Sequence, residues 1–518
     1  MIPVIDIFAG PGGLGEGFSS IGRNESSPRF RIALSIEKHP SAHLTLQLRS
    51  FFRQFPPGKA PSAYYSVLQG ESDVQRLFEK FPKEAKLASA EAWLAELGVV
   101  ARDEVSSRIT TALDGSKCWV LIGGPPCQPY STAGRSRVKG LEEYKPEKDN
   151  RHRLYREYLH ILTEHWPPVF VMENVTGLLS SQLNGESMFQ HILRDLRAPG
   201  KALRSSRSDG KAAENRYRIA SLSHVNMFGE IKPDEFIVKA EELGVPQARH
   251  RVILVGIRED LGDVRPDLLG VKKQVPARNV LSGLPSLRSG LSREPDTAEA
   301  WQAALEDAKD RRWLTGVQKA AGSEVQALIM STLKSLRHPR YGRGSEFVRC
   351  EPTCPHEPGW FVDDRIEGAC SHASRAHIRK DLHRYLFASC FARVHGRSPR
   401  LKDFPPDLLP EHENVQKALK DGGLFNDRFR VQLADKPSTT ITSHIAKDGH
   451  YYIHPDPTQC RSLTVREAAR LQTFPDNYFF TGNRTSQYKQ VGNAVPPLMA
   501  RAIGERVHAV LRKVGLTE

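Results

Sequence analysis

Residues 2–18 read IPVIDIFAGPGGLGEGF, an apolar run followed at once by a glycine-rich stretch. This order is typical of a buried strand, a tight turn and a helix. Gly10, Gly12 and Gly15 have the G-x-G-x-x-G spacing, and acidic Glu37 ends a second apolar run, RIALSIEK. Such glycines let the backbone approach a nucleotide, while the carboxylate accepts hydrogen bonds from ribose hydroxyls. The motif alone leaves open a dinucleotide, another adenosyl cofactor, or a turn that binds nothing.

Further apolar runs predict three more strands, and helical patterns lie between several of them. The runs are CWVLIGG (118–124), VFVMENV (169–175) and RVILVGI (251–257). This alternation predicts an α/β fold, a Rossmann-like and mostly parallel doubly wound sheet with helices on both faces. Charged residues 75–114 look like a helical insertion. The C-terminal stretch is an amphipathic helix, expected to cover the sheet edge beside the first strand.

The composition excludes several classes of protein. With 518 residues, 39% hydrophobic and 26% charged, the chain suits a soluble protein of more than one domain. No stretch is long and apolar enough to span a bilayer, and no secretion signal precedes the first strand. The seven scattered cysteines suit a reducing compartment. We therefore expect a cytoplasmic protein, with a net charge of +14 that favours a polyanionic partner.

Three kinds of reactive side chain follow or precede predicted strands. Cys127 comes directly after Pro125-Pro126, which restrict the backbone before the sulfur, and Glu173 lies near the end of the next strand. In a doubly wound sheet, the carboxyl ends of the strands face the ligand crevice. Arg249 and Arg251 lead into the following strand and should share a face. Each also has a purely structural interpretation: Cys127 as a small buried thiol, Glu173 as a helix cap, and the arginines as surface residues.

Together, a thiol, an acid and a guanidinium suit one reaction. Carbon 5 of cytosine is a poor nucleophile, but a thiolate that adds at carbon 6 converts the ring into an enamine. A carboxylic acid that donates a proton to ring nitrogen 3 eases this addition. An arginine beside the exocyclic oxygen stabilises the charge that develops.

The ordered series FAGPGG, PPCQ, ENV, QARHR and QVGNAVPP resembles the DNA (cytosine-5)-methyltransferase family. The resemblance covers residues 1 to about 258 and about 437 to 518. It implies S-adenosylmethionine as cofactor, S-adenosylhomocysteine as product, and double-stranded DNA as partner. It also implies a catalytic domain of residues 1–261, a less regular target-recognition domain of residues 262–436, and a return to the catalytic domain at residues 437–518.

The resemblance also implies roles for individual residues. Cys127 matches the nucleophile, Glu173 the acid, Arg251 the ligand of the cytosine oxygen, Arg249 a support for the carboxylate, and Asn174 a wall of the pocket. The matched cofactor positions are Phe8, Ala9, Gly10, Pro11, Gly12, Gly13, Glu37, Pro126, Leu154, Asn493 and Val495. The family has an adenine-binding aspartate, for which Asp73 is the best match, although it lies far upstream of the cysteine strand.

A buried cytosine must leave the duplex before its ring can react. The loop after Cys127 matches the segment that closes over DNA. Its expected contacts with DNA come from Gln128, Ser131, Arg135, Arg137 and Lys139. A solvated charged loop is the ordinary alternative. Residues 262–436 should read base edges, but the sequence gives no recognition code.

Other readings stay open at this stage. Cys350, Cys354, His356, Cys370 and His372 invite a zinc site, but their spacing matches no standard pattern, so we expect no metal. Rival functions are a transfer-RNA cytosine methyltransferase on the same fold, a nicotinamide-dependent oxidoreductase and an inactive DNA-binding protein. A cognate restriction endonuclease, or another defence component, is a candidate partner. The family expectation is a monomer.

Overall fold

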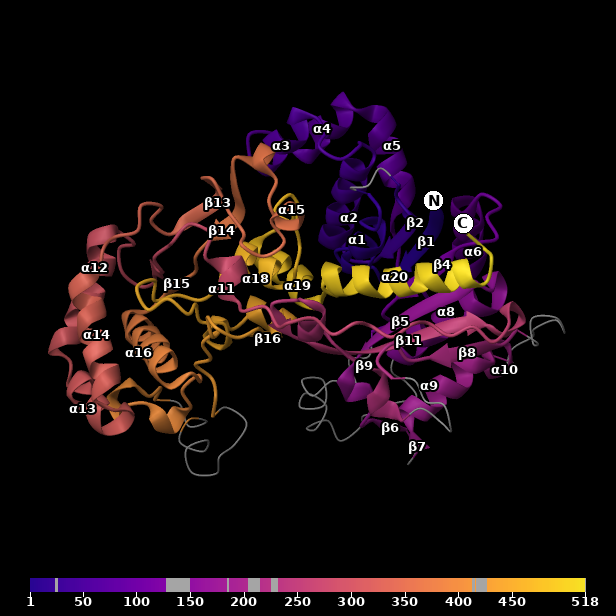
Figure 1. The fold of residues 1–518 in the computed structure, drawn as a ribbon. Coiled ribbons are helices and arrows are strands. Elements are labelled where there is room, and N and C mark those ends of the chain that lie inside the picture. Colours follow the sequence, from indigo (N-terminus) through magenta and orange to yellow (C-terminus); the bar gives the residue numbers. More distant parts are fainter. Residues whose placement is uncertain are drawn as a thin grey trace.

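The computed structural model describes residues 1–23, 27–126, 150–183, 186–203, 215–224, 232–411, 415 and 426–517. Within these ranges, no helix is both long and apolar enough to cross a membrane. A large sheet with its helices lies on the right of Figure 1, and a mainly helical region lies on the left. The two parts are joined by segments from the middle and the end of the chain.

The large sheet has the strand order β3-β2-β1-β4-β5-β11-β8, with β9 also pairing with β11. Its strands are β1 (Ile2–Ile7), β2 (Phe30–Glu37), β3 (Ala92–Leu94), β4 (Val120–Gly123), β5 (Val169–Val175), β8 (Tyr217–Ala220), β9 (Ile237–Lys239) and β11 (His250–Arg258). Strands β1 to β5 run parallel, whereas β11 is antiparallel to β5, β8 and β9. The prediction of a mostly parallel α/β sheet is confirmed.

Two hydrophobic cores cover the two faces of this sheet. Alternation along β1 places Ile2 and Val4 in one core and Ile5 and Ile7 in the other. The first core includes α1 (Gly13–Ser19) and α20 (Pro497–Lys513), and the second includes α6 (Arg102–Leu113), α8 (Asn150–His165) and α9 (Met188–Arg197). Helices thus pack on both faces, as the α/β pattern predicts.

The expected position of the C-terminal helix is wrong in one respect. Strand β1 is not an edge strand, because β2 and β4 flank it. Helix α20 instead lies across a face of the sheet beside α1, with Ile503, Val507 and Val510 in the shared core (Figure 1). The predicted apolar stripe of Ile503, Val507, Val510 and Val514 is confirmed except for Val514, which follows the end of α20, and the strand order could not be predicted from the sequence.

The predicted insertion at residues 75–114 begins and ends later than the inserted helices do. The inserted helices are α3 (Ser62–Leu68), α4 (Val74–Lys80) and α5 (Pro82–Glu91), which follow α2 (Pro40–Arg53). Strand β3 and helix α6, by contrast, belong to the main fold, since Val105 and Ile109 of α6 lie in its core. Strand β3 has only three residues, too few to show a period of two.

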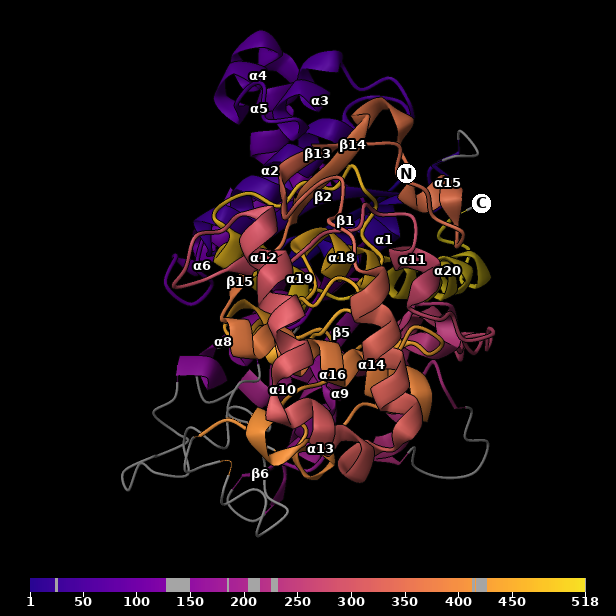
Figure 2. The ribbon, with the colours of Figure 1, turned by 90° about the vertical axis from the view of Figure 1, so that its left-hand side faces the viewer.

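The mainly helical region has a core of its own. Its helices are α12 (Ala298–Glu306), α13 (Arg312–Ala321), α14 (Ser323–Ser335) and α16 (Arg379–His395), which face the viewer in Figure 2. A hairpin of β13 (Gly344–Arg349) and β14 (Gly368–Ala373) extends toward α3. This region contains more helix than its sequence, rich in arginine and proline, led us to expect.

Two helices near the end of the chain connect the parts. They are α18 (Val465–Leu471) and α19 (Arg484–Asn493), and their core includes Val280, Leu281 and Phe361 from the middle of the chain. Helix α18 also contacts β14. The C-terminal segment therefore supports the helical region before it returns to the large sheet.

Candidate active site

The glycine-rich loop joins β1 to α1 through several residues in the left-handed region. Phe8, Gly10 and Gly12 have φ angles of 55°, 58° and 90°. Gly13 lies against the C-terminal segment, since a Cβ built on it would be 2.1 Å from the carbonyl oxygen of Val495. A side chain at position 13 is therefore excluded, and the loop and Val495 form one surface.

Glu37 at the end of β2 reaches this loop. Its carboxylate accepts hydrogen bonds from the backbone N–H groups of Gly10, at 2.9 Å, and His39, at 2.7 Å. The β1 and β2 ends are adjacent because the strands are parallel neighbours. The structure thus brings together the predicted cofactor residues Phe8, Gly10 and Glu37 at one edge of the sheet.

Asp73, the predicted adenine ligand, does not lie there. It is the exposed N-cap of α4, where its carboxylate accepts from the N–H of Arg76 and pairs with the guanidinium of the same residue. The acid that follows the neighbouring strand is Glu96, two residues after β3. Leu94 pairs with Glu37 in the sheet, and Glu96 forms an ion pair of 3.0 Å with Lys38. Asp73 as the adenine ligand stays a prediction, and its exposed position on α4 does not favour it.

Glu173 and Asn174 contact the segment that precedes Cys127. A Cβ built on Gly124 would lie 2.6 Å from Oε2 of Glu173, and Nδ2 of Asn174 donates to the carbonyl of Pro125 at 3.3 Å. Strands β4 and β5 are parallel neighbours, so these groups meet at the carboxyl ends of both. The predicted residues Cys127, Gln128, Ser131, Arg135, Arg137 and Lys139 lie outside the described residues.

Arg251 completes this group through the antiparallel direction of β11. Because β11 starts where β5 ends, Arg251 pairs with Val175, and Ile253 pairs with Glu173. The guanidinium Nε of Arg251 lies 2.8 Å from Oε1 of Glu173. Burial lowers the pKa of Arg251, and the Glu173 carboxylate opposes that change. The predicted acid and guanidinium therefore share one site.

Arg249 donates hydrogen bonds to the C-terminal part of the chain. Its guanidinium donates to the carbonyls of Ile441, at 2.6 Å, and Gly492, at 3.2 Å, rather than to Glu173. Burial, followed by repulsion from Arg251, lowers its pKa, while Glu173 acts on it only through space in the other direction. Arg249 thus links the residue before β11 to the segments that contain Ile441 and Gly492, and its predicted support of the Glu173 carboxylate stays a prediction.

The remaining predicted cofactor residues are spread over neighbouring elements. Pro126 follows β4, and Leu154 lies on α8, both half-buried. Val495 is buried against the glycine loop, whereas Asn493, the last residue of α19, is exposed. The C-terminal segment, residues 437–518, therefore contacts the glycine loop through Val495.

Two residues at this edge were not among the predicted site residues. The hydroxyl of Tyr478 donates to the carbonyl of Pro11, and the carboxyl of Asp6 is completely buried in β1. Burial raises the pKa of Asp6 to about 8. Sequence pattern could have pointed to Asp6, the only charged residue in the first apolar run, but not to Tyr478.

The cysteines and histidines considered for zinc have separate partners. Cys354 donates to the carbonyl of His356, Cys370 to that of Leu68, and His372 contacts Thr464 and the carbonyl of Pro285. Burial raises the pKa of Cys354 to about 11, which favours the protonated thiol. Among the described residues, no group of three or more such side chains is arranged to hold a metal.

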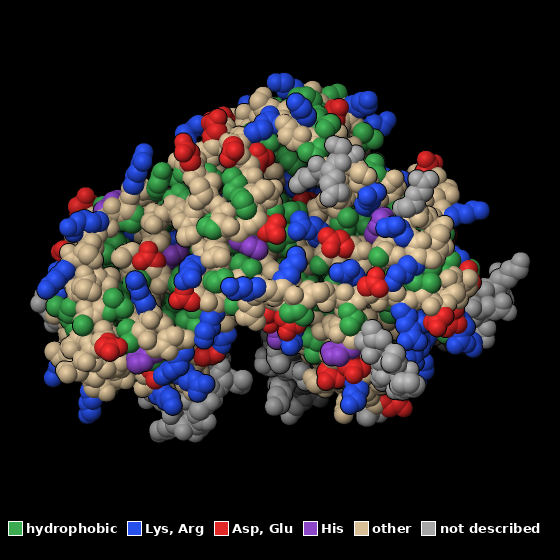
Figure 3. All heavy atoms as spheres, in the orientation of Figure 1, with side chains coloured by type: hydrophobic (Ala, Val, Ile, Leu, Met, Phe, Trp, Pro, Cys, Tyr) green, Lys and Arg blue, Asp and Glu red, His purple; other side chains and the backbone are tan. Residues whose placement is uncertain are grey.

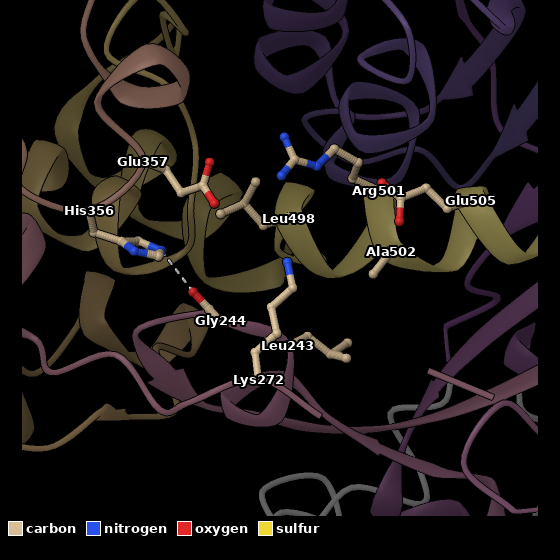
Figure 4. A pocket seen from close by; sticks show the side chains of 9 residues that line it. All are labelled: Leu243, Gly244, Lys272, His356, Glu357, Leu498, Arg501, Ala502 and Glu505. Carbon is tan, nitrogen blue, oxygen red and sulfur yellow. Dashed lines mark hydrogen bonds between the residues drawn. The ribbon is translucent and has the colours of Figure 1, made fainter. Parts of the chain in front are cut away.

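A pocket elsewhere in the structure is lined by none of the predicted site residues. Figure 4 shows it between α20, the end of η6 (Ala240–Leu243) and the loop containing His356. Cationic Lys272 and Arg501 face it together with Glu357 and Glu505, and His356 contacts the Gly244 carbonyl at 2.9 Å. Its mixed lining gives no preference for an anion or a cation.

The chain is similar to several known proteins. The family described as C-5 cytosine-specific DNA methylase matches residues 99–204 and 222–509. Type II methyltransferase M.Bpa9945I of Bacillus paralicheniformis is 30% identical over 98% of this chain and 99% of its own. DNA (cytosine-5-)-methyltransferase M.ApeKI of Aeropyrum pernix is 27% identical over 81% of this chain and 87% of its own.

A solved structure supports the fold. It is a prophage-encoded protein of E. coli, assigned as a DNA modification methyltransferase, with a TM-score of 0.51 and 17% identity. The alignment covers 99% of this chain and 100% of that one. The family match extends over most of the chain and includes Glu173, Arg251 and Val495. The chain therefore belongs to the C-5 cytosine-specific DNA methylase family and is a DNA (cytosine-5-)-methyltransferase.

Proposed function

We propose that the protein transfers a methyl group from S-adenosylmethionine to carbon 5 of a cytosine within a specific double-stranded DNA sequence, after the base has left the duplex. The observation that carries this proposal is the Glu173–Arg251 pair, which meets the segment before Cys127. It lies at the carboxyl ends of parallel strands, as do the glycine loop and Glu37. Acid, guanidinium and cofactor surface are thus available to one ligand crevice.

The described residues fit S-adenosylmethionine. Gly10 has a positive φ angle and a Cβ built on it would meet nothing within 4 Å, so the backbone there is open to a ligand. We propose that Glu37 holds the ribose hydroxyls and that Glu96, rather than Asp73, contacts the adenine edge. Phe8, Ala9, Pro11, Pro126, Leu154, Asn493 and Val495 would line the remainder. When bound, the cofactor supplies an electrophilic methyl group.

The protein's own residues would perform the other steps. The Cys127 thiolate would form a bond to carbon 6 while Glu173 protonates nitrogen 3. The ring then becomes an enamine whose carbon 5 is nucleophilic. Arg251, aligned by Glu173, stabilises the exocyclic oxygen, and Asn174 holds the Pro125 carbonyl. After methylation, solvent water would accept the carbon 5 proton, the carbon 6–sulfur bond would break to release the thiolate, and nitrogen 3 would return its proton to Glu173, which restores the aromatic ring.

DNA recognition is proposed for residues 262–436, with contacts also from the loop after Cys127. Figure 3 shows Lys and Arg interleaved with Asp and Glu on the face that carries α20, so the net charge is not concentrated there.

The names of the type II relatives support a cognate restriction endonuclease as partner. We also propose that the protein acts as a monomer, which light scattering after gel filtration can check.

The experiment uses a host that lacks cytosine methylation. Wild-type protein should produce 5-methylcytosine at one DNA sequence, read by bisulfite sequencing of host DNA. Cys127→Ser should bind cofactor and DNA but leave the DNA unmethylated. Cys118→Ser, which alters a half-buried thiol two residues before β4, should remain active. Full methylation by Cys127→Ser would exclude covalent catalysis by this thiol.

A further inference from the structure

The segment between α18 and α19 contains a turn that touches the glycine loop. We call residues 476–478, Asp476, Asn477 and Tyr478, the 476–478 turn. The Tyr478 hydroxyl donates to the carbonyl of Pro11, and a Cβ built on Gly12 would lie 2.9 Å from that hydroxyl. Tyr478 is fully buried. A side chain from the far end of the chain thus fixes the carbonyl at the middle of the loop.

A second link joins the turn to helix α1, which directly follows the glycine loop. The Asn477 side-chain oxygen accepts from Nη1 of Arg49 at 2.9 Å, and Nε of the same arginine donates to Glu16 of α1 at 2.9 Å. The Arg49 guanidinium also lies 4.9 Å from the centre of the Tyr478 ring. Both Arg49 and Glu16 are buried. The turn therefore contacts the loop directly and its helix through one arginine.

The same turn is held by the inserted helices and by the helical region. Tyr64 donates to the carbonyl of Asn477 at 2.9 Å, and both Tyr65 and Asn477 donate to one oxygen of Asp363 at 2.9 Å. Within the turn, Asp476 forms a buried ion pair of 2.6 Å with Arg470 of α18. These contacts leave the turn little freedom, so its position is set by three parts of the molecule.

We propose that Tyr478 is a positioning residue for cofactor binding, acting through Pro11, and that the 476–478 turn transmits the docking of the insertion and the helical region to the glycine loop. This inference rests on the proposed function, since it concerns the cofactor site. The loop is costly to order, because its glycines lose more conformational freedom than other residues and Phe8 has a positive φ angle. Holding it in place before the cofactor arrives lowers the cost of binding.

The test compares two conservative substitutions of buried tyrosines. Tyr478→Phe removes the hydroxyl that holds Pro11, and Tyr488→Phe removes a hydroxyl that donates to the Leu463 carbonyl at 2.6 Å, away from the loop. Calorimetry would measure binding of S-adenosylhomocysteine to the full chain without DNA. Tyr478→Phe should weaken binding about tenfold, the worth of one buried hydrogen bond. Tyr488→Phe should keep wild-type affinity.

Kinetics supplies a readout that general destabilisation would not move. In Tyr478→Phe the KM for S-adenosylmethionine should rise while kcat at saturating cofactor stays at the wild-type value. Equal affinity in Tyr478→Phe and the wild type would overturn the inference, as would equal losses in both variants. If Tyr478→Phe does not fold, Asn477→Ala tests the inference instead. It should weaken binding of S-adenosylhomocysteine about threefold. Unchanged affinity there overturns the inference.

The two proposals fail differently. If the wild-type protein binds no S-adenosylhomocysteine, the cofactor assignment fails and this inference fails with it. If the wild type binds but Tyr478→Phe binds equally well, only the role of Tyr478 is lost.

Discussion

At the scale of single residues, the sequence pattern and the structure favour different acids as the adenine ligand. Asp73 is exposed on α4, whereas Glu96 follows the strand beside Glu37. We expect Glu96→Ala to raise the KM for S-adenosylmethionine roughly tenfold, the loss of a hydrogen bond to a charged group. Asp73→Ala should leave this KM unchanged. Initial rates at varied cofactor concentration measure both, and a selective effect of Asp73→Ala would reverse the assignment.

Asp6 gives a prediction about pH. Burial raises its pKa in the folded protein to about 8, whereas the unfolded carboxyl titrates near its ordinary value of 3.8. Between these values the folded state keeps a proton that the unfolded state loses, so stability falls as pH rises from about 4 to about 8.

Asp6→Asn has no such titration. The difference in unfolding free energy, wild type minus variant, should fall by a few kcal/mol across that window, at about 1.4 kcal/mol per pKa unit. Urea unfolding at several pH values measures this difference. Parallel curves for the two proteins would show that Asp6 does not hold the proton.

At the scale of elements, helix α18 depends on a buried arginine. Arg470 forms hydrogen bonds of 2.9 and 2.6 Å to Asp476 and donates to the carbonyls of Val280 and Thr353. Arg470→Ala would leave Asp476 buried without this cation, so we expect a loss of about 3–5 kcal/mol in unfolding free energy.

An exposed pair provides the matched control for Arg470. Arg311→Ala breaks the ion pair with Asp307 on a surface turn and should cost about 0.5 kcal/mol or less. Urea unfolding followed by tryptophan fluorescence compares the two variants. Similar losses in both would mean that the buried pair does not anchor α18.

Which elements could be predicted from the sequence follows from how local their signals are. Strands β1, β2, β4, β5 and β11 are continuous apolar runs, and the stripe of α20 repeats at helical spacing, so each was found. Strands β3, β8 and β9 have three or four residues each and were missed. The reversed direction of β11, which brings Arg251 to Glu173, depends on pairing between distant segments and leaves no local signal.

At the scale of the whole molecule, the site was easier to predict than the way it is supported. Glu173 and Arg251, like Glu37 and Gly10, were predicted as site residues from short motifs beside strand ends, although their pairing was not. The roles of Arg249 and Tyr478 depend on Gly492 and Pro11, residues hundreds of positions away. Such contacts arise only when the middle of the chain has folded and the C-terminal segment has returned.

The packing of α20 beside α1 also has a consequence for protein synthesis. Val4 and Phe18 from the first segment share a core with Ile503 and Val507 from the last, and the labels N and C lie close together in Figure 1. A ribosome releases the segment of Val4 and Phe18 long before α20. In the nascent chain, one apolar side of β1 therefore stays uncovered until α20 has been synthesised. Premature termination before α20 should yield a product prone to aggregation and degradation.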